Sequence, residues 1–411
     1  MSSPAPTPAA TAAPSPRLVS LDALRGFDMF WILGADALVH ALNKVNGSRV
    51  AAFFAGQLDH CEWVGFRFFD LIFPLFVFMS GASMAWSLSK TIAQHGRGAA
   101  VKRVLLRGLV IFVIGIFYNG GFTNPWPDMR LLGVLQRIGL AYTGAGLLYV
   151  FLKPRALAGV GAAILIGYWA LLTFVPIRDI QLEKSVIVGQ LGTAKPTMEQ
   201  VRAAFDATTA RVTGHYEPGY NLTNHLDFQY LPGRLYDTYY DPEGYLSTLP
   251  AVVTCLIGVL AGLLMRRTDL SDAEKLRALL IAAAAGMALG WLWHLQFPVI
   301  KKIWTSSYVL VAGGYSCGLL AAFFYMVDVR GWRRWCVPFV WIGMNPLGLY
   351  VANNLIKFRV LALRFAGGDI KAWLDSHVGN GAGDGLIAIV GLALMFTLAW
   401  FLHSRKIFLR V

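Results

Sequence analysis

The sequence has few charged residues. Only 14% of its 411 residues are Asp, Glu, Lys or Arg, whereas soluble domains carry about 25%. Hydrophobic residues make up 56%, and the mean hydropathy is +0.54. Apolar runs of about 18 residues or more, the length at which a helix crosses a bilayer, recur along the chain. This balance excludes an ordinary soluble domain and indicates a chain embedded in lipid.

Cysteine is also scarce, and its spacing excludes two kinds of site. The four cysteines, Cys61, Cys255, Cys317 and Cys336, lie far apart, and three of them fall in apolar runs. Neither a zinc-binding spacing nor a disulfide framework is visible. We therefore expect no bound metal.

The net charge of +13 does not indicate nucleic-acid binding, because the basic residues cluster in short breaks between apolar runs. That arrangement is typical of membrane topology signals.

The first 16 residues, "MSSPAPTPAATAAPSP", lack the basic start and apolar core of a signal peptide. Their Pro, Ala, Ser and Thr content predicts a disordered cytoplasmic tail. Residues 17–411 then form a single transmembrane domain.

The apolar runs predict an all-α polytopic membrane protein with ten spans. Lys and Arg are concentrated in alternate breaks, which places both termini in the cytoplasm. The stretch 355–364 remains ambiguous and is also consistent with a short re-entrant or interfacial helix. The predicted spans are 25–44, 68–88, 102–121, 131–152, 156–176, 247–265, 276–295, 303–326, 336–357 and 384–402.

Residues 177–246 form one long polar loop, which the topology places on the periplasmic side. Long loops of this kind are usually functional or disordered. Tyrosines recur through its second half together with Asn, Asp and Gly. Aromatic faces beside hydrogen-bonding groups suit a carbohydrate, and they equally suit an ordered cap without a ligand.

Ionisable residues inside spans are costly, and they usually face a cavity or a partner. We place four arginines at the inner mouth: Arg25, Arg103, Arg107 and Arg137. Guanidinium groups bind phosphate in a bidentate manner, so such a cluster suits a phosphorylated ligand. The alternative is stop-transfer charge whose side chains extend to the lipid headgroups.

A second group of titratable residues lies at the outer side. Asp36 and His40 share one helix face, and His60 follows just before the second span. Since the first two spans are hairpin partners, we expect Asp36 to meet His60. Histidine titrates near neutral pH and suits a general base, although a lone interfacial histidine is more often structural.

Several motifs, taken in order, resemble those of the heparan-α-glucosaminide N-acetyltransferase family. These polytopic enzymes carry acetyl from acetyl-CoA across a membrane to a glucosamine amine. The likeness covers about residues 17–411 and is carried by "SLDALRGFD", "HCEWVGFRFFDLIFPLFVFMSG", "RLLGVLQRIGLAY", "YDPEGYLSTLPAVVTCLIGVLAG", "FPVIKKIWTSSYVL", "WIGMNPLGLYV" and "SRKIF". It implies the bacterial, ten-span form in the inner membrane, and a homodimer.

The resemblance assigns roles to individual residues. The active-site histidine of the family falls on His60, and Asn345 matches the asparagine of "GMN". Asp36 stands where the family has an asparagine. We assign Asp36 to orienting His60, and Asn345 to stabilising the oxyanion. The residues expected to bind the acceptor sugar are Trp63, Asp70, Lys301, Tyr240 and Glu243.

The resemblance implies a route for the reaction. Acetyl-CoA would bind through its nucleotide at the inner arginines, and an amino-sugar or glycan acceptor would enter from the periplasm. His60 acts either as a base in direct transfer or as a nucleophile that carries the acetyl group. The acceptor group is either an amine or a hydroxyl, because the same base can deprotonate both. The competing class is a sugar or small-molecule transporter without acyl transfer.

Overall fold

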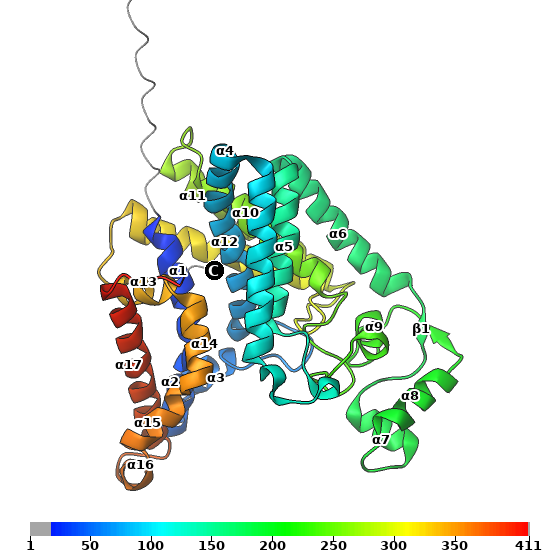
Figure 1. Cartoon of the computed structure of the whole chain (residues 1–411). Coiled ribbons are helices and arrows are strands. Elements are labelled where there is room, and N and C mark those ends of the chain that lie inside the picture. Colours follow the sequence, from blue (N-terminus) through cyan, green and yellow to red (C-terminus); the bar gives the residue numbers. More distant parts are fainter. Residues whose placement is uncertain (1–17, 410–411) are drawn as a thin grey trace, which may run out of the picture.

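The helices form two groups, each of which packs mainly within itself (Figure 1). The computed structural model describes residues 18–409, so the predicted tail over 1–16 lies outside the described residues. The first group unites the two ends of the described chain: α1 (Val19–Phe30), η1 (Trp31–Ala35), α2 (Asp36–Asn46), α3 (Arg49–Gln57), α13 (Val337–Gly343), α14 (Pro346–Ile356), α15 (Phe358–Ala366), α16 (Gly368–His377) and α17 (Ala382–Ser404). The second group comprises α4 (Phe68–Tyr118), α5 (Val134–Phe151), α6 (Pro154–Phe174), α10 (Thr248–Met265), α11 (Asp272–His294), α12 (Ser306–Phe323) and η4 (Phe324–Val329).

The architecture fits the predicted all-α membrane protein. Each of the ten predicted spans coincides with helical structure, and 355–364 contains the short helix α15. Within residues 18–409, six helices are long and apolar enough to cross a membrane, whereas ten spans and cytoplasmic termini stay predictions. The six candidate spans are α5, α6, α10, α11, α12 with η4, and α17.

Two long helical runs are interrupted. The run from α1 to α2 passes through the π-helix η1, in which Gly34 has φ 110°. L-residues with a Cβ rarely adopt such a φ, so glycine permits the break at this position. The 51-residue helix α4 is divided at Gly96 into two antiparallel arms.

Helices α4 and α10 cross at very short range. A Cβ added to Gly258 would lie 1.9 Å from the carbonyl oxygen of Phe78, and one added to Gly81 would lie 2.0 Å from the carbonyl oxygen of Cys255. In a membrane, small residues of this kind let helix backbones approach closely and gain van der Waals contact. This contact fixes α4, which carries one wall of the site described below.

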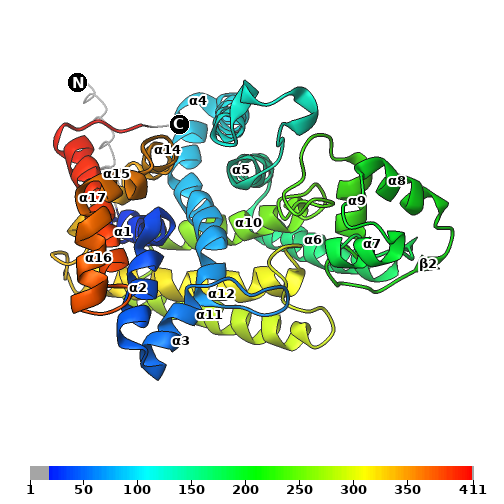
Figure 2. The same cartoon turned by 90° about the horizontal axis from the view of Figure 1, so that it is seen from below.

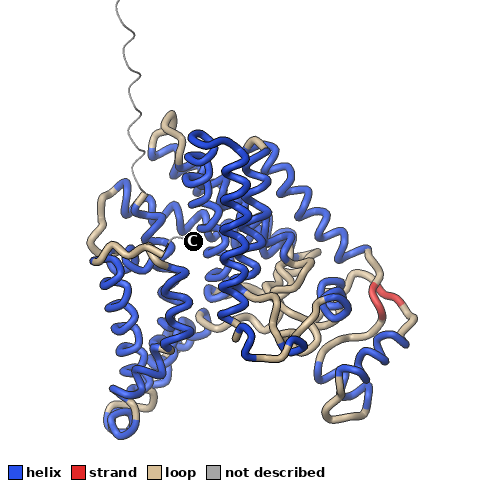
Figure 3. The backbone as a smooth tube through the Cα atoms, viewed as in Figure 1, coloured by secondary structure: helices blue, strands red, loops and turns tan. Residues whose placement is uncertain are grey.

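The predicted long loop is a folded cap. It contains α7 (Lys184–Leu191), α8 (Met198–Ala207), α9 (Leu222–Tyr230) and the antiparallel pair β1 (Ile177–Arg178) and β2 (Arg211–Val212). Figure 3 shows this pair in red, beside helices in blue and loops in tan. The buried core of the cap consists of Ile180, Leu182, Ile187, Val201, Phe205, Phe228, Tyr239 and Tyr240.

Loops that follow alternate spans converge at one end of the molecule, beside the cap (Figure 2). Val64 pairs with Ile300, and Arg130 pairs with Gly233 of the cap. The Trp63 indole donates to the carbonyl of Tyr216 at 2.8 Å. The loop before α4 is thereby fixed against the α11–α12 loop and the cap.

Candidate functional site

His60 is oriented by Asp70. The chain leaves α3 as an extended loop and re-enters helix at α4, where Asp70 lies in the first turn. The Asp70 Oδ2 atom accepts from the backbone N–H groups of Arg67 (3.2 Å) and Cys61 (3.1 Å). Its Oδ1 atom lies 2.9 Å from His60 Nδ1. Because an ionised carboxylate only accepts, we assign the proton of the neutral imidazole to Nδ1, which leaves the lone pair on Nε2.

Burial differs sharply between these two side chains. Asp70 is 1% exposed, whereas His60 is 53% exposed. The carboxylate is thus a fixed support, and the imidazole presents an edge to the space beside it. His60 also packs on Phe69, with ring centroids 4.9 Å apart.

Lys301 completes the cluster from the α11–α12 loop. Its Nζ atom lies 3.0 Å from His60 Nδ1, 3.4 Å from His60 Nε2 and 3.4 Å from Asp70 Oδ1. Burial lowers the pKa of the Lys301 ammonium, and the Asp70 charge counteracts this effect. The loop therefore places a cation directly beside the candidate base.

Cys61 borders the same space but is a poor nucleophile. Burial and the neighbouring Asp70 carboxylate raise the pKa of the Cys61 thiol. Since the thiolate is the reactive form, Cys61 is largely unreactive at neutral pH.

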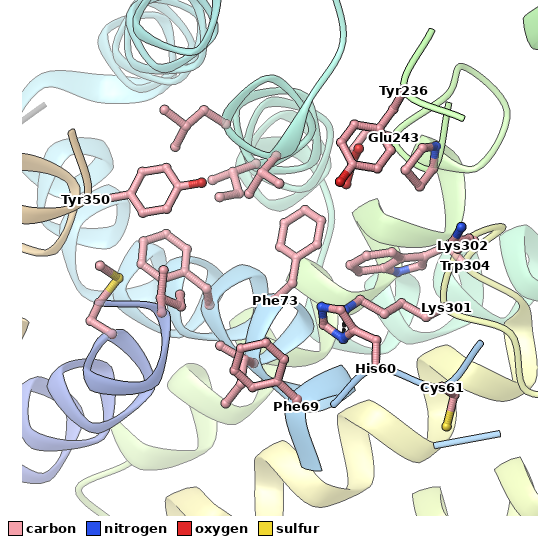
Figure 4. A pocket seen from close by; sticks show the side chains of 18 of the residues that line it. His60, Cys61, Phe69, Phe73, Tyr236, Glu243, Lys301, Lys302, Trp304 and Tyr350 are labelled. Carbon is pink, nitrogen blue, oxygen red and sulfur yellow. Dashed lines mark hydrogen bonds between the residues drawn. The ribbon is translucent and has the colours of Figure 1, made fainter. Parts of the chain in front are cut away.

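A cavity of about 400 Å³ opens beside His60, between the two helix groups. Figure 4 shows that His60, Lys301, Lys302 and Glu243 gather on one side of it, and that Tyr350 lies on the other. The polar side offers groups that can take part in a reaction, and the apolar side suits an uncharged part of a ligand. The lining residues are Met29, Ile32, His60, Cys61, Trp63, Phe69, Ile72, Phe73, Phe76, Arg130, Val134, Leu135, Ile138, Tyr236, Pro242, Glu243, Lys301, Lys302, Trp304, Leu347 and Tyr350.

An ion-pair cluster around Glu243 forms a polar wall on the same side of the cavity as His60. Arg130 donates to both carboxylate oxygens of Asp241 (3.0 and 2.8 Å) and to Glu243 (2.6 Å). Burial and the Asp241 charge raise the pKa of Glu243 to about 7. The guanidinium of Arg130 also lies 4.7 Å from the ring centre of Tyr236. Glu243 therefore changes charge near neutral pH while it faces the cavity.

The structure brings together most of the predicted acceptor-binding residues. Trp63, Lys301 and Glu243 line the cavity with His60, and Asp70 lies directly behind the histidine. Tyr240 is buried and makes an edge contact with Trp63 at 6.2 Å, so it supports the wall from behind.

Two predicted catalytic assignments need correction. Asp36 starts α2 and does not line the cavity, and within residues 18–409 the carboxylate bonded to His60 is that of Asp70. Asn345 is fully buried, but its amide donates to the Ile407 carbonyl (2.9 Å) and accepts from the Leu409 N–H (2.8 Å). Asn345 therefore holds the C-terminal segment, and it is not placed to donate into the cavity.

Arg137 was placed at the wrong end by the sequence prediction. Its guanidinium donates to Ser247 and to the Gly244 carbonyl (3.4 Å), and it lies 5.0 Å from the Trp304 ring centre. Arg137 is 1% exposed and borders the cap, behind the polar wall. It is thus separated from the inner mouth where the other three arginines were expected.

Each of the other three arginines has its own partner, and none lines the cavity beside His60. Arg25 donates to the Gly343 carbonyl (3.0 Å) and to Ser83. Arg103 donates to Thr91 (2.9 Å). Arg107 lies over the Tyr142 ring at 4.8 Å. A role for these arginines in binding a nucleotide stays a prediction.

Sequence reasoning missed several lining residues. Arg130 and Lys302 stand within the quoted motifs "RLLGVLQRIGLAY" and "FPVIKKIWTSSYVL", so the signal for them was present. Tyr236 stands between motifs, and only the fold of the cap brings it to the cavity. Within residues 18–409, no group of three or more His, Cys, Asp or Glu side chains is arranged to hold a metal ion.

The chain is similar to curated proteins named heparan-alpha-glucosaminide N-acetyltransferase, and no family model matches it. It is 25% identical to the human protein over 96% of its own length, and 25% identical to the mouse protein over 86%. The chain spans 60% and 56%, respectively, of the length of these relatives. The similarity confirms the resemblance predicted from the motifs.

Proposed function

We propose that this chain is a transmembrane acetyltransferase. In this proposal, acetyl passes from cytosolic acetyl-CoA to the amino or hydroxyl group of a glucosamine-like sugar on the periplasmic side of a bacterial inner membrane. The observation that carries the proposal is the His60–Asp70 pair on the wall of the cavity. The named activity of the two similar proteins points to the same chemistry and does not favour a transporter.

His60 serves as the general base in direct transfer. The neutral acceptor amine attacks the thioester carbonyl, so that a C–N bond forms and the C–S bond breaks. The proton released by the amine passes to His60 Nε2 and from there to the departing CoA thiolate. Asp70 holds Nδ1–H throughout and stabilises the imidazolium that forms.

Lys301 takes the role that the sequence suggested for Asn345. Its ammonium lies beside the imidazole, where a negative charge would develop on the carbonyl oxygen. A fixed cation at this position stabilises the oxyanion more in the transition state than in the ground state. Glu243 and Trp63 face the same space and would bind the acceptor sugar.

The donor would reach this point from the opposite end of the molecule. The nucleotide of acetyl-CoA would bind near Arg25, Arg103 and Arg107. The uncharged pantetheine arm would lie along the apolar side of the cavity, where Ile72, Phe76 and other hydrophobic residues line it. A second chemical route, in which His60 itself carries the acetyl group, uses the same geometry.

The purified full chain in lipid nanodiscs tests this function. It is incubated with labelled acetyl-CoA and a panel of amino sugars, and acetylated products are identified by mass spectrometry. We expect transfer by the native protein and by H377A, a variant of an exposed histidine on α16. H60A should lose about 10²–10⁴-fold in rate.

Normal turnover by H60A would refute the proposed site. Sugar uptake into proteoliposomes without CoA, in the absence of acetyl transfer, would instead support a transporter. The two-step route is tested by omitting the acceptor, because only that route leaves labelled acetyl on His60.

A further inference from the structure

Acetylation of an amine at neutral pH requires two proton acceptors, and His60 supplies one of them. The amine of an amino sugar lies beside electron-withdrawing carbons, as an α-amino group does, and such amines have a pKa of about 8. The acceptor is therefore mostly an ammonium at pH 7. Its nitrogen carries three protons, and the amide product keeps one. His60 passes one proton to the departing thiolate, which leaves a second proton without an acceptor.

Glu243 is placed to receive that proton. Among the described residues that line the cavity, it carries the only carboxylate, and it lies on the same side as His60 (Figure 4). Its side chain is 11% exposed, so it reaches the cavity while the protein encloses most of it. Burial lowers the pKa of Lys301 beside the imidazole, and the charges of Asp70 and Glu243 counteract this effect. The carboxylate of Glu243 and the imidazole of His60 thus border one space.

The neighbouring ion pair lets Glu243 exist in either charge state. Arg130 donates to both oxygens of Asp241 (3.0 and 2.8 Å), so Asp241 balances its charge even when Glu243 is neutral. The contact from Arg130 to Glu243 is made through Oε2 at 2.6 Å. Within residues 18–409, no group donates a hydrogen bond to Oε1 of Glu243. A proton on Oε1 therefore breaks no existing hydrogen bond.

The charges around Glu243 hold its affinity for protons near that of the acceptor. Burial and the Asp241 charge raise the pKa of Glu243 to about 7, and the charges of Arg137 and Arg130 limit the rise. A carboxyl group with this pKa can take a proton from an ammonium and release it again near neutral pH. The charged and titratable groups that interact with Glu243 from the surrounding elements are Arg130, Arg137, Asp241, Lys301 and Tyr350.

We propose that Glu243 is a second catalytic base, which takes the first proton from the acceptor ammonium before His60 takes the next. An N–H bond of the ammonium breaks as an O–H bond forms on Glu243, and the electron pair left on nitrogen attacks the thioester carbonyl. His60 then removes one proton from nitrogen and delivers it to the thiolate. The proton on Glu243 returns to water when the product leaves, so each turnover releases one proton.

This inference rests on the acetyltransferase activity proposed above, and it adds a residue and a proton-transfer step to that reaction. The step is specific to a charged acceptor. A neutral acceptor has only one proton to lose, and His60 alone would suffice for it.

The pH dependence of E243Q tests the step. Transfer from labelled acetyl-CoA to glucosamine is measured between pH 6 and pH 9 with the full chain in nanodiscs. At pH 7 the variant has to use the fraction of amine that is already neutral, about a tenth, so kcat/KM should fall about tenfold or more. The loss should shrink to less than about threefold at pH 9 and should include kcat. A loss that is equal at every pH, or confined to KM, would overturn the proposal.

A second acceptor isolates the charge of the amine. The nitrogen of 2-hydroxyamino-2-deoxyglucose is largely neutral at pH 7, because hydroxylamines are weaker bases than amines. E243Q should acetylate this sugar within about threefold of the native rate, and an equal deficit with both sugars would contradict a base. E199Q removes an exposed carboxylate of the cap and should match the native chain with both acceptors.

Thermal melts establish that E243Q is folded. If it is not, E243A with added formate replaces it, because a small carboxylate can occupy the vacated space. Formate should raise the rate of E243A with glucosamine at pH 7 and have little effect at pH 9. The absence of any gain at pH 7 would count against the base.

The failure of this inference differs from the failure of the proposed function. If the native chain acetylates glucosamine and E243Q follows the same pH profile, the second base is refuted and the acetyltransferase stands. If the native chain transfers acetyl to no amino sugar, the activity is refuted and the second base with it.

Discussion

The Nδ1 atom of His60 lies 2.9 Å from the Oδ1 atom of Asp70, ten residues further along the chain. This contact joins a buried carboxylate to a half-exposed imidazole on the wall of the cavity. It requires the turn between α3 and α4, because the same Asp70 side chain also accepts from two backbone N–H groups of that turn.

The first prediction concerns Asp70. In D70N the side-chain amide can present its N–H₂ group to His60, which would leave the imidazole proton on Nε2, the atom that has to act as the base. We expect acetyl transfer to fall on the order of 10²-fold or more. Turnover is measured by mass spectrometry in nanodiscs, with D36N as the comparison because Asp36 lies outside the cavity. A greater loss in D36N than in D70N would restore the pairing predicted from the sequence.

The second prediction separates the charge of Lys301 from its bulk. K301M should lower kcat about 10²–10³-fold, as expected when a donor to the oxyanion is removed. K301R keeps a cation and should retain more activity. The split between kcat and KM identifies the role, since a residue that only binds acceptor would change KM alone.

The third prediction concerns the pH dependence of stability. The pKa of Glu243 is raised from 4.5 to about 7 in the folded chain. Between pH 4.5 and pH 7 the folded state therefore binds more protons than the unfolded state. The contribution of Glu243 to the free energy of unfolding is complete below pH 4.5 and is lost as the pH rises through 7. The melting temperature of E243Q should change less between pH 5 and pH 8 than the melting temperature of the native chain. An unchanged difference would contradict a raised pKa.

The fourth prediction tests the crossing of α4 and α10. G258A adds a Cβ that would lie 1.9 Å from a backbone oxygen of Phe78, which cannot move without shifting the helix. We expect a loss of about 1–3 kcal/mol or failure to fold. G167A in α6 is the control, because nothing lies within 4 Å of its added Cβ. Size-exclusion profiles and melting temperatures in detergent compare the two variants.

The fifth prediction tests the corrected role of Asn345. N345A removes the partners of the Ile407 carbonyl and the Leu409 N–H, and leaving such groups unpaired costs about 1–3 kcal/mol each. The variant should melt earlier, while its folded fraction keeps most of the kcat. A normal melting temperature with a 10²-fold lower kcat would instead support an oxyanion role.

The sequence was sufficient to predict the helices, and several of the predicted site residues lie together in the structure. A long apolar run is a local property, so each predicted span coincides with helix. Motif positions identified His60, Trp63, Lys301 and Glu243, and the structure places all four on one cavity.

The errors concern relations between segments. Asp36 and His60 were paired because adjacent spans form a hairpin, but Gly34 interrupts the first helical run and α3 intervenes before His60. Arg137 begins the fourth span, so alternation along the chain already places it at the same end as His60. The position of Tyr236 depends on how the cap folds, and no local pattern encodes that contact.

The two helix groups contribute different kinds of side chain to the cavity between them. All of its charged side chains come from the second group, its connecting loops and the cap, whereas the first group contributes Met29, Ile32, Leu347 and Tyr350. Substitutions can therefore change the volume of the cavity without changing its charged side chains. Substitutions at Ile32 or Leu347 can reshape the space for a longer acyl chain without altering a charge, which makes that wall the natural starting point for engineering donor choice.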